Sequence, residues 1–202
     1  SNLNQPNGTD IDAVQATVMN QAQYRKFSTH NSAIFNFVVD AAAGNEELAA
    51  IRWYELRQSD DGQPWEIFQE GTYTAPEGRP AWMGSMSMDL QGNIGLGYSS
   101  MLSPDPSDPG EPVSLRYTGR YANDPLGDMT VEEGTFVISN GNSTSLRYAD
   151  YAHMSVDPSN DKQFWFVSEY FSPARSHRVG VFQIAANYAY DIGVTSIDSP
   201  VS

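Results

Sequence analysis

Basic side chains recur at one fixed distance before three aspartates in this chain. The segments that this spacing defines are His30–Asp40, Arg79–Asp89 and Arg147–Asp157, each beginning with the basic residue. An arginine presents a planar pair of N–H donors that matches a carboxylate or a sulfate group. If the three segments occupy equivalent positions in a repeated structure, their basic groups line one face and select an anionic saccharide.

Aromatic and acidic residues close to two of these positions complete the candidate binding site. Trp82 and Tyr151 offer flat rings on which a sugar can stack, and Asp150 lies at the position in the third segment that Trp82 holds in the second. The sequence therefore predicts a ligand-binding set, which is His30, Arg79, Trp82, Arg147, Asp150 and Tyr151.

Two alternatives remain open for these residues. The arginines could instead pair with carboxylates such as Glu70, Glu133 or Asp150 and hold adjacent repeats together. The chain could also be a polysaccharide-acting hydrolase, which needs two carboxylates about 5–10 Å apart in a cleft. Glu55, Asp150 and Glu169 are the candidates for such a pair. The G-x-S-x-G, H-E-x-x-H, P-loop and dinucleotide-binding motifs are absent, so we favour binding over catalysis.

Each of the three segments ends in a pattern typical of a β-strand. Apolar residues occupy the positions three and one before the aspartate, and the interleaved positions are small or polar. The apolar residues are Phe37, Val39, Met86, Met88, Met154 and Val156. The pattern predicts a strand with one apolar face, and the closing aspartate predicts a turn after it.

The similarity continues past each turn into a second predicted strand. These second strands are expected at 50–57, 93–100 and 163–170, and residues 69–73 (QEGTY) resemble residues 132–136 (EEGTF). Units of about 40–50 residues with three or four strands are typical of β-propeller blades. An antiparallel sandwich, whose hairpins resemble one another, is the alternative. The expected fold is thus all-β, with about three blades of a β-propeller.

The repeats divide the chain into three predicted parts. Residues 1–13 are a surface segment, 14–188 are the propeller portion with repeats closing at Asp40, Asp89 and Asp157, and 189–202 are a linker or the start of a following domain. Val18–Phe27 is predicted to be the last strand of a preceding blade. Three blades do not close a propeller, so the remaining blades are expected from another segment or another chain.

Composition limits the kinds of partner. The 202 residues include 25 acidic and 11 basic side chains, for a net charge of −14, which disfavours binding to nucleic acid. No apolar run is long enough to insert into a membrane, and the absence of cysteine excludes disulfides and thiol chemistry. No cofactor is expected. Asp157, Asn160 and Asp161 share one turn and could hold Ca²⁺, although a hydrogen-bonded turn explains them more simply.

Seven motifs together carry a resemblance to a known family. They are RWYELR (52–57), QEGTY (69–73), WMGSMSMD (82–89), GNIGLGYS (92–99), RYTGR (116–120), DPLGDMT (124–130) and SVDP with FWF (155–166). From about Val18 to Ala186 the chain resembles the C-terminal half of a propeller-like module of large secreted bacterial surface proteins, often followed by Ig-like or sorting domains. It departs from that family at Ala149, where a glycine is expected, and at Lys162, where a cysteine is common.

The resemblance implies a setting more than a reaction. The expected function is a non-catalytic binding or scaffold module, glycan-binding or adhesive, in a secreted or cell-surface bacterial protein.

Overall fold

The computed structural model describes residues 2–7, 9–42, 47–104 and 106–184, and over these ranges the chain is all-β. Their one helical element is a single 3₁₀ turn, η1, at Pro76–Gly78. The described residues contain no helix that is long and apolar enough to cross a membrane. The predicted linker at 189–202 lies outside the described residues.

Three antiparallel sheets, each a simple meander, follow one another along the chain. The N-terminal sheet contains β3 (Gln23–Lys26), β4 (Asn31–Asp40), β5 (Ala49–Gln58) and β6 (Glu66–Tyr73) in that order. The central sheet contains β7 (Ala81–Met88), β8 (Ile94–Leu102), β9 (Glu111–Arg120) and β10 (Val131–Ile138). The C-terminal sheet contains β11 (His153–Val156), β12 (Gln163–Ser172) and β13 (Ala174–Gln183). None of the sheets is closed on itself.

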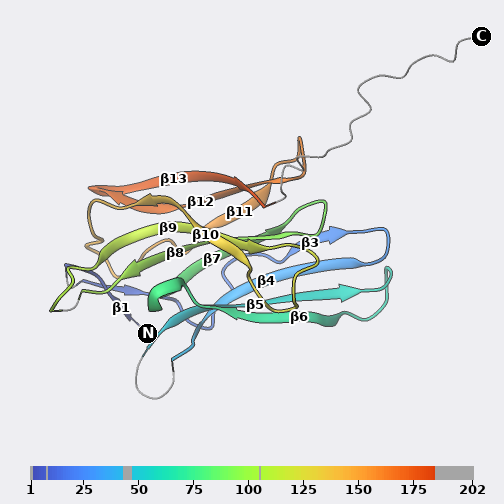
Figure 1. The fold of residues 1–202 in the computed structure, drawn as a ribbon, viewed down its shortest axis with the longest axis horizontal. Coiled ribbons are helices and arrows are strands. Elements are labelled where there is room, and N and C mark those ends of the chain that lie inside the picture. Colours follow the sequence, from blue (N-terminus) through green and yellow to red (C-terminus); the bar gives the residue numbers. More distant parts are fainter. Residues whose placement is uncertain (1, 8, 43–46, 105, 185–202) are drawn as a thin grey trace, which may run out of the picture.

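The central sheet lies between the other two, so the molecule has three layers (Figure 1). On one side, Ile34 and Ile51 of the N-terminal sheet share a buried cluster with Met86. On the other side, the Phe166 ring of the C-terminal sheet lies directly over Gly97, where an added Cβ would come within 2.4 Å of it. Glycine at this position therefore lets an aromatic ring reach the backbone of the central sheet.

Strand β7 differs from its predicted one-sided pattern because it is covered on both faces. All eight of its residues are buried. Met86 and Met88 lie in the buried cluster shared with the N-terminal sheet, whereas Ser85 faces the C-terminal sheet and accepts a hydrogen bond from the Met154 N–H at 2.9 Å. A β-bulge between Trp82 and Ser85, with Met83 at φ +51°, switches the two faces along the strand. Small residues here permit close packing and do not face water.

The first predicted repeat was placed one strand too late. Strands β7 and β11 each begin their sheet, whereas β4, which carries Phe37, is the second strand of its sheet after β3. The turns that close the first strands confirm the corrected alignment. The N–H of the residue that follows each first strand donates to a carbonyl at or just before the start of the next strand. These bonds are Phe27 to His30 at 2.8 Å, Asp89 to Asn93 at 2.9 Å and Asp157 to Gln163 at 2.8 Å. Phe27 is thus the equivalent of Asp89, and Asp40 is not.

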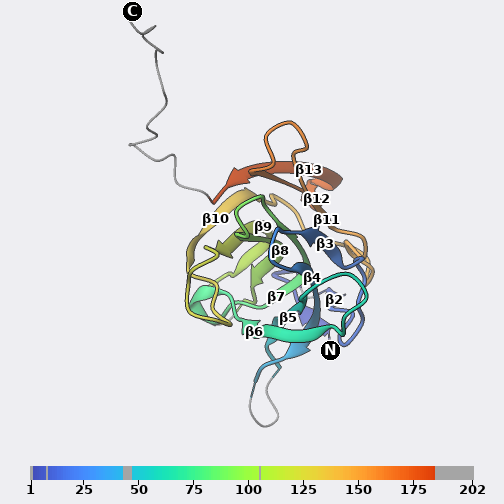
Figure 2. The same cartoon turned by 90° about the vertical axis from the view of Figure 1, so that its right-hand side faces the viewer.

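Val18–Phe27 is likewise not part of a separate preceding sheet. Within it, β3 pairs antiparallel with β4 and forms the edge of the N-terminal sheet. Strands β3, β7 and β11 lie close to one another, and β6, β10 and β13 lie at the periphery (Figure 2). Two bonds fix the direction of β3, because the Asn20 amide donates to the Gly84 carbonyl at 3.0 Å and Arg25 donates to the Met88 carbonyl at 2.9 Å. The first strands of these two sheets therefore run in the same direction.

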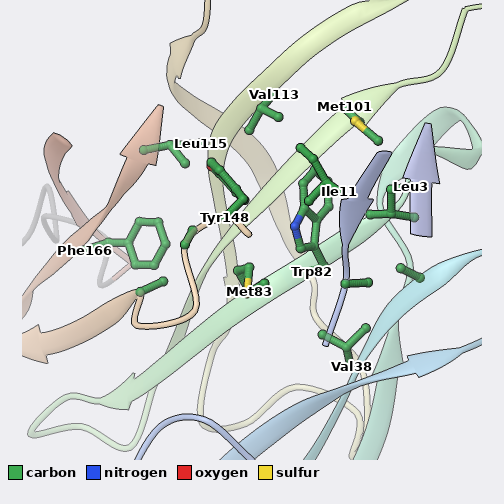
Figure 3. Packing of buried hydrophobic residues seen from close by; sticks show 14 of the residues in the cluster. Leu3, Ile11, Val38, Trp82, Met83, Met101, Val113, Leu115, Tyr148 and Phe166 are labelled. Atoms are coloured by element: carbon green, nitrogen blue, oxygen red, sulfur yellow. The ribbon is translucent and has the colours of Figure 1, made fainter. Parts of the chain in front are cut away.

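The N-terminal residues are more deeply packed than a surface segment. Strands β1 (Asn2–Asn4) and β2 (Asp10–Asp12) form a hairpin whose Leu3 and Ile11 side chains are buried. Figure 3 shows both side chains in the same core as Trp82 and Met101. Residues 2–7 and 9–13 are consequently part of the folded unit, at the opposite end of the molecule from the β3–β4 turn (Figure 1).

Candidate functional site

The three basic groups of the predicted site do not meet on one face. His30 follows β3 and lies at the end of the molecule where the first strands finish, whereas Arg79 lies before the start of β7. Because β3 and β7 run in the same direction, these positions are at opposite ends of the sheets. The misplacement follows directly from the repeat alignment that began at β4.

Arg79 is buried in the connection between η1 and β7, against the central sheet. Its guanidinium donates to Ser100 Oγ at 2.8 Å and to the Glu133 carboxylate, which also accepts from Arg116 at 2.7 Å and from the Tyr98 hydroxyl. Burial raises the pKa of Glu133, but the bonds from Tyr98 and Arg79 and the charge of Arg116 outweigh it and leave this pKa below its ordinary value. Arg79 therefore pairs with a carboxylate, as the structural alternative expects, and the pair joins strands of one sheet.

The remaining predicted residues divide between the core and an exposed loop. Trp82 is fully buried, with its ring centroid 6.0 Å from that of Tyr148, so it presents no surface to a ligand. Arg147 pairs with Asp150 on the loop before β11, and the neighbouring Tyr151 is 83% exposed. Ala149 in this loop has φ +51°, a conformation that glycine adopts more freely than alanine.

The three carboxylates considered for hydrolysis are all engaged by protein donors. Glu55 is buried and accepts hydrogen bonds from Ser32, Arg57 and Gln69. Glu169 pairs with Arg175 at 2.8 Å, and Asp150 pairs with Arg147. None of the three lines a cavity that we describe below.

The turn considered for Ca²⁺ is held by hydrogen bonds. The Asp157 carboxylate accepts from the Ser159 N–H, and the Asn160 side chain accepts from the N–H groups of Lys162 and Gln163. Asp161 forms a two-point ion pair with Arg25 of β3. The described residues contain no group of three or more acidic or histidine side chains arranged to hold a metal.

A cavity of about 440 Å³ lies where β3, β7 and β11 approach one another, and it has little free binding chemistry. Its one cation, Arg25, is neutralised by Asp161 and also donates to the Met88 carbonyl. Gln23 donates to the Met154 carbonyl at 3.4 Å. These side chains join the sheets, so we interpret the cavity as part of the contact between sheets and not as a binding site.

A second cavity, of about 520 Å³, lies between the β3–β4 turn and the β5–β6 hairpin, and we call it the hairpin pocket. Hydrogen bonds hold the two turns together, since the Asn31 amide donates to Gln58 at 2.9 Å and to Asp61 at 2.8 Å. Lys26 adds an ion pair to Asp61 at 2.6 Å. The lining residues are Thr29, His30, Arg57, Ser59, Gln63, Pro64, Glu66, Ile67 and Phe68.

Arg57 is the principal charged donor in the hairpin pocket. Its Nε donates to Glu55 at 2.6 Å, and its guanidinium carbon lies 3.4 Å from the centre of the Phe68 ring. Within the described part of the chain, its two terminal nitrogens make no hydrogen bond. Glu55 and Phe68 thus hold the guanidinium in place, and its two terminal nitrogens remain able to donate to a ligand.

His30 supplies a second polar group to the same pocket. Its ring stacks on Phe27 at 4.9 Å, and its Nδ1 lies 2.9 Å from the Thr29 hydroxyl. Its Nε2 is buried and has no partner among the described residues. Burial lowers the pKa of His30, and the charge of Arg57 lowers it further against the opposing effect of Glu55. The imidazole is therefore neutral at pH 7.

Of the predicted binding residues, only His30 lines the hairpin pocket. Arg57 and Phe68 were not predicted, although Glu55 and Arg57 are two apart on one strand and so share a face. That spacing was a usable signal for Arg57. Phe68 had no such signal, because it lies next to a bulge in the pairing of β5 with β6.

Comparisons with known proteins found no relative that could guide the interpretation of the fold or the site. No protein-family model matches the chain, and neither the curated proteins nor the solved structures gave a match.

Proposed function

We propose that this protein is a non-catalytic binding module and that the hairpin pocket binds an anionic saccharide. The observation that carries the proposal is the state of Arg57, which lines a cavity of about 520 Å³ and whose two outer nitrogens make no hydrogen bond to any residue that the structure describes. A guanidinium edge of this kind donates two parallel hydrogen bonds to a carboxylate or a sulfate.

The rest of the pocket suits a sugar that carries the anion. The exposed edge of Phe68 and the apolar side chain of Ile67 give contact area for a ring, and Gln63 and Ser59 add groups for hydroxyls. Neutral His30 can accept from a hydroxyl or donate to an oxygen through Nε2, according to its tautomer. A free phosphate would fill only the Arg57 edge, whereas a saccharide also uses the ring contacts.

We further propose that the three layers are consecutive blades of a propeller-like structure in a secreted or cell-surface protein. Three features support it: the sheets are meanders in chain order, their first strands lie together, and β3 and β7 run in the same direction. An acidic, cysteine-free β-protein with the family resemblance described above fits an extracellular setting. No observation favours a hydrolase.

Binding of charged polysaccharides tests the pocket directly. Isothermal titration with heparin, chondroitin sulfate, alginate and neutral dextran should show binding of at least one anionic polymer and none of dextran. Arg57→Lys keeps a positive charge beside Glu55 but loses the paired donors, so binding should weaken about tenfold or more, as expected for a charged hydrogen bond worth about 1.5–3 kcal/mol.

Arg52→Lys is the matched control, because Arg52 lies on the same strand but is occupied by Glu70, Thr72 and the Tyr54 ring. It should leave saccharide binding unchanged. Equal weakening by both variants, or binding of every anion in proportion to its charge alone, contradicts a site at Arg57.

A further inference from the structure

The solvent-facing side of the N-terminal sheet carries a continuous row of apolar side chains. Its members alternate with the buried residues Ile34, Asn36 and Val38, and therefore point away from the central sheet. We call this surface the aromatic face; it consists of Tyr24, Ala33, Phe35, Phe37, Tyr54 and Leu56. The Tyr54 ring stacks between Phe35 at 5.4 Å and Phe37 at 6.1 Å, and Tyr24 is 57% exposed.

The opposite end of the stack of layers carries a second apolar surface. We call it the valine face; it consists of Trp165, Val167, Val179 and Val181 on β12 and β13. Val179 is 53% exposed and Trp165 is 42% exposed. A hollow of about 240 Å³ lies beside Trp165, bounded by Ser155 and Pro158. Figure 1 shows that these faces belong to the two outer layers of the molecule.

We propose that copies of this chain associate head to tail, with the aromatic face of one copy covering the valine face of the next. Contiguous apolar side chains at a protein surface mark candidate interfaces, and Tyr24, Trp165, Val179 and Val181 are the exposed members of the two faces. Within the chain, aromatic side chains of one sheet already pack against a flatter neighbouring sheet, as Phe166 does over Gly97. The valine face offers a similar receiving surface, with a hollow that can take a protruding ring such as Tyr24.

The carboxylates beside the two faces are paired with arginines, so both faces can be buried in an interface. The chain has 14 more acidic than basic groups, yet Glu70 at the edge of the aromatic face pairs with Arg52, and Glu169 beside the valine face pairs with Arg175. Docking of the two faces therefore leaves neither carboxylate buried without its partner. The net charge still repels two copies at long range, so association should strengthen as salt screens it.

The head-to-tail arrangement follows from the presence of two different faces. An aromatic face packed on a second aromatic face would leave both valine faces in water, whereas head-to-tail contact covers one face of each kind at every junction. Such contacts close into a ring or extend without limit, and the convergence of the first strands favours a ring. None of the residues in the two faces lines the hairpin pocket, although Ile67 of that pocket pairs with Leu56 of the aromatic face.

Light scattering and native mass spectrometry on the whole chain test the proposal. A discrete oligomer is expected, with a mass that is a multiple of 22.3 kDa and a population that rises with salt. Phe37→Asp and Val179→Asp, which each damage one face, should abolish the ring. Tyr24→Asp is a more exposed second variant in case Phe37→Asp fails to fold. Val18→Asp introduces the same charge at a site outside both faces and should leave the oligomer intact.

Mixing the damaged variants separates the possible arrangements. Phe37→Asp retains a valine face and Val179→Asp retains an aromatic face, so an equimolar mixture should form a one-to-one heterodimer through the single intact junction. A monomeric wild-type chain overturns the proposal, and so does a Val179→Asp variant that still dimerises by itself. Saccharide titration on the same samples reports on the hairpin pocket separately.

Discussion

Arg79 and Arg147 begin equivalent segments in the sequence, and the structure predicts opposite consequences for replacing them by alanine. Arg79 is buried and donates to Ser100 and Glu133, whereas the Arg147 side chain is 72% exposed. Removing one partner of a buried ion pair typically costs about 3–5 kcal/mol, because the other charge stays buried. Glu133 would keep its bonds from Arg116 and Tyr98, so we expect a loss of about 2–4 kcal/mol for Arg79→Ala.

Thermal unfolding followed by circular dichroism measures this difference. For a chain of this size, the expected loss for Arg79→Ala corresponds to a fall in Tm of about 5–15 °C. Arg147→Ala should leave Tm unchanged, because its ion pair with Asp150 is on the surface and screened by water. Similar melting temperatures for the two variants would refute the assignment of Arg79 to the buried network.

Three further outcomes follow from the packing of the sheets. Gly71→Ala should lower the free energy of unfolding, measured by chemical denaturation, by about 2–3 kcal/mol, because the added Cβ would come within 2.1 Å of the Gly127 carbonyl. Gly62→Ala is the control, since its Cβ would meet no atom within 4 Å, and it should cost only about 1 kcal/mol. Arg120→Lys should speed amide hydrogen exchange of residues 121–130, since one ammonium cannot replace the guanidinium that binds the carbonyls of Asp124, Pro125 and Asp128; unchanged exchange contradicts this role. The pKa of Glu133 is lower in the folded chain than its ordinary value of 4.5, so its contribution to stability is present above about pH 4.5 and is lost as the pH falls through the folded pKa. Glu133→Gln should therefore reduce the fall in Tm at acidic pH. An unchanged fall in Tm would contradict this contribution of Glu133.

The sequence alone determined the all-β class and the positions of several strands. Alternation of apolar and small residues around Met86 and Met154, followed by an aspartate and a turn, predicted strands that the structure contains as β7 and β11. The second strands predicted at 50–57, 93–100 and 163–170 are present as parts of β5, β8 and β12. These signals are local, since a strand and its turn depend on residues within a few positions of one another.

Tertiary structure decided which strand begins each sheet. Asp40 and Asp89 close strands of similar pattern, but only the hydrogen bonds of β3 to β4 reveal that the former ends a second strand. Because the first repeat was aligned one strand too late, His30 lies at the opposite end of the molecule from Arg79. Alternation repeats every two residues and carries no information about a strand's neighbours, so an alignment of repeats can slip by a whole strand unnoticed.

Tertiary structure also decided the role of each charged side chain. Arg57, Arg79 and Arg147 are the same residue type, yet one edges a cavity, one is buried against Glu133 and one is on an exposed loop. Their environments come from segments distant in the sequence, such as β10 for Arg79 and the β3–β4 turn for Arg57. The balance between desolvation and pairing sets what a charge does, and it depends on neighbours that only the folded chain brings together.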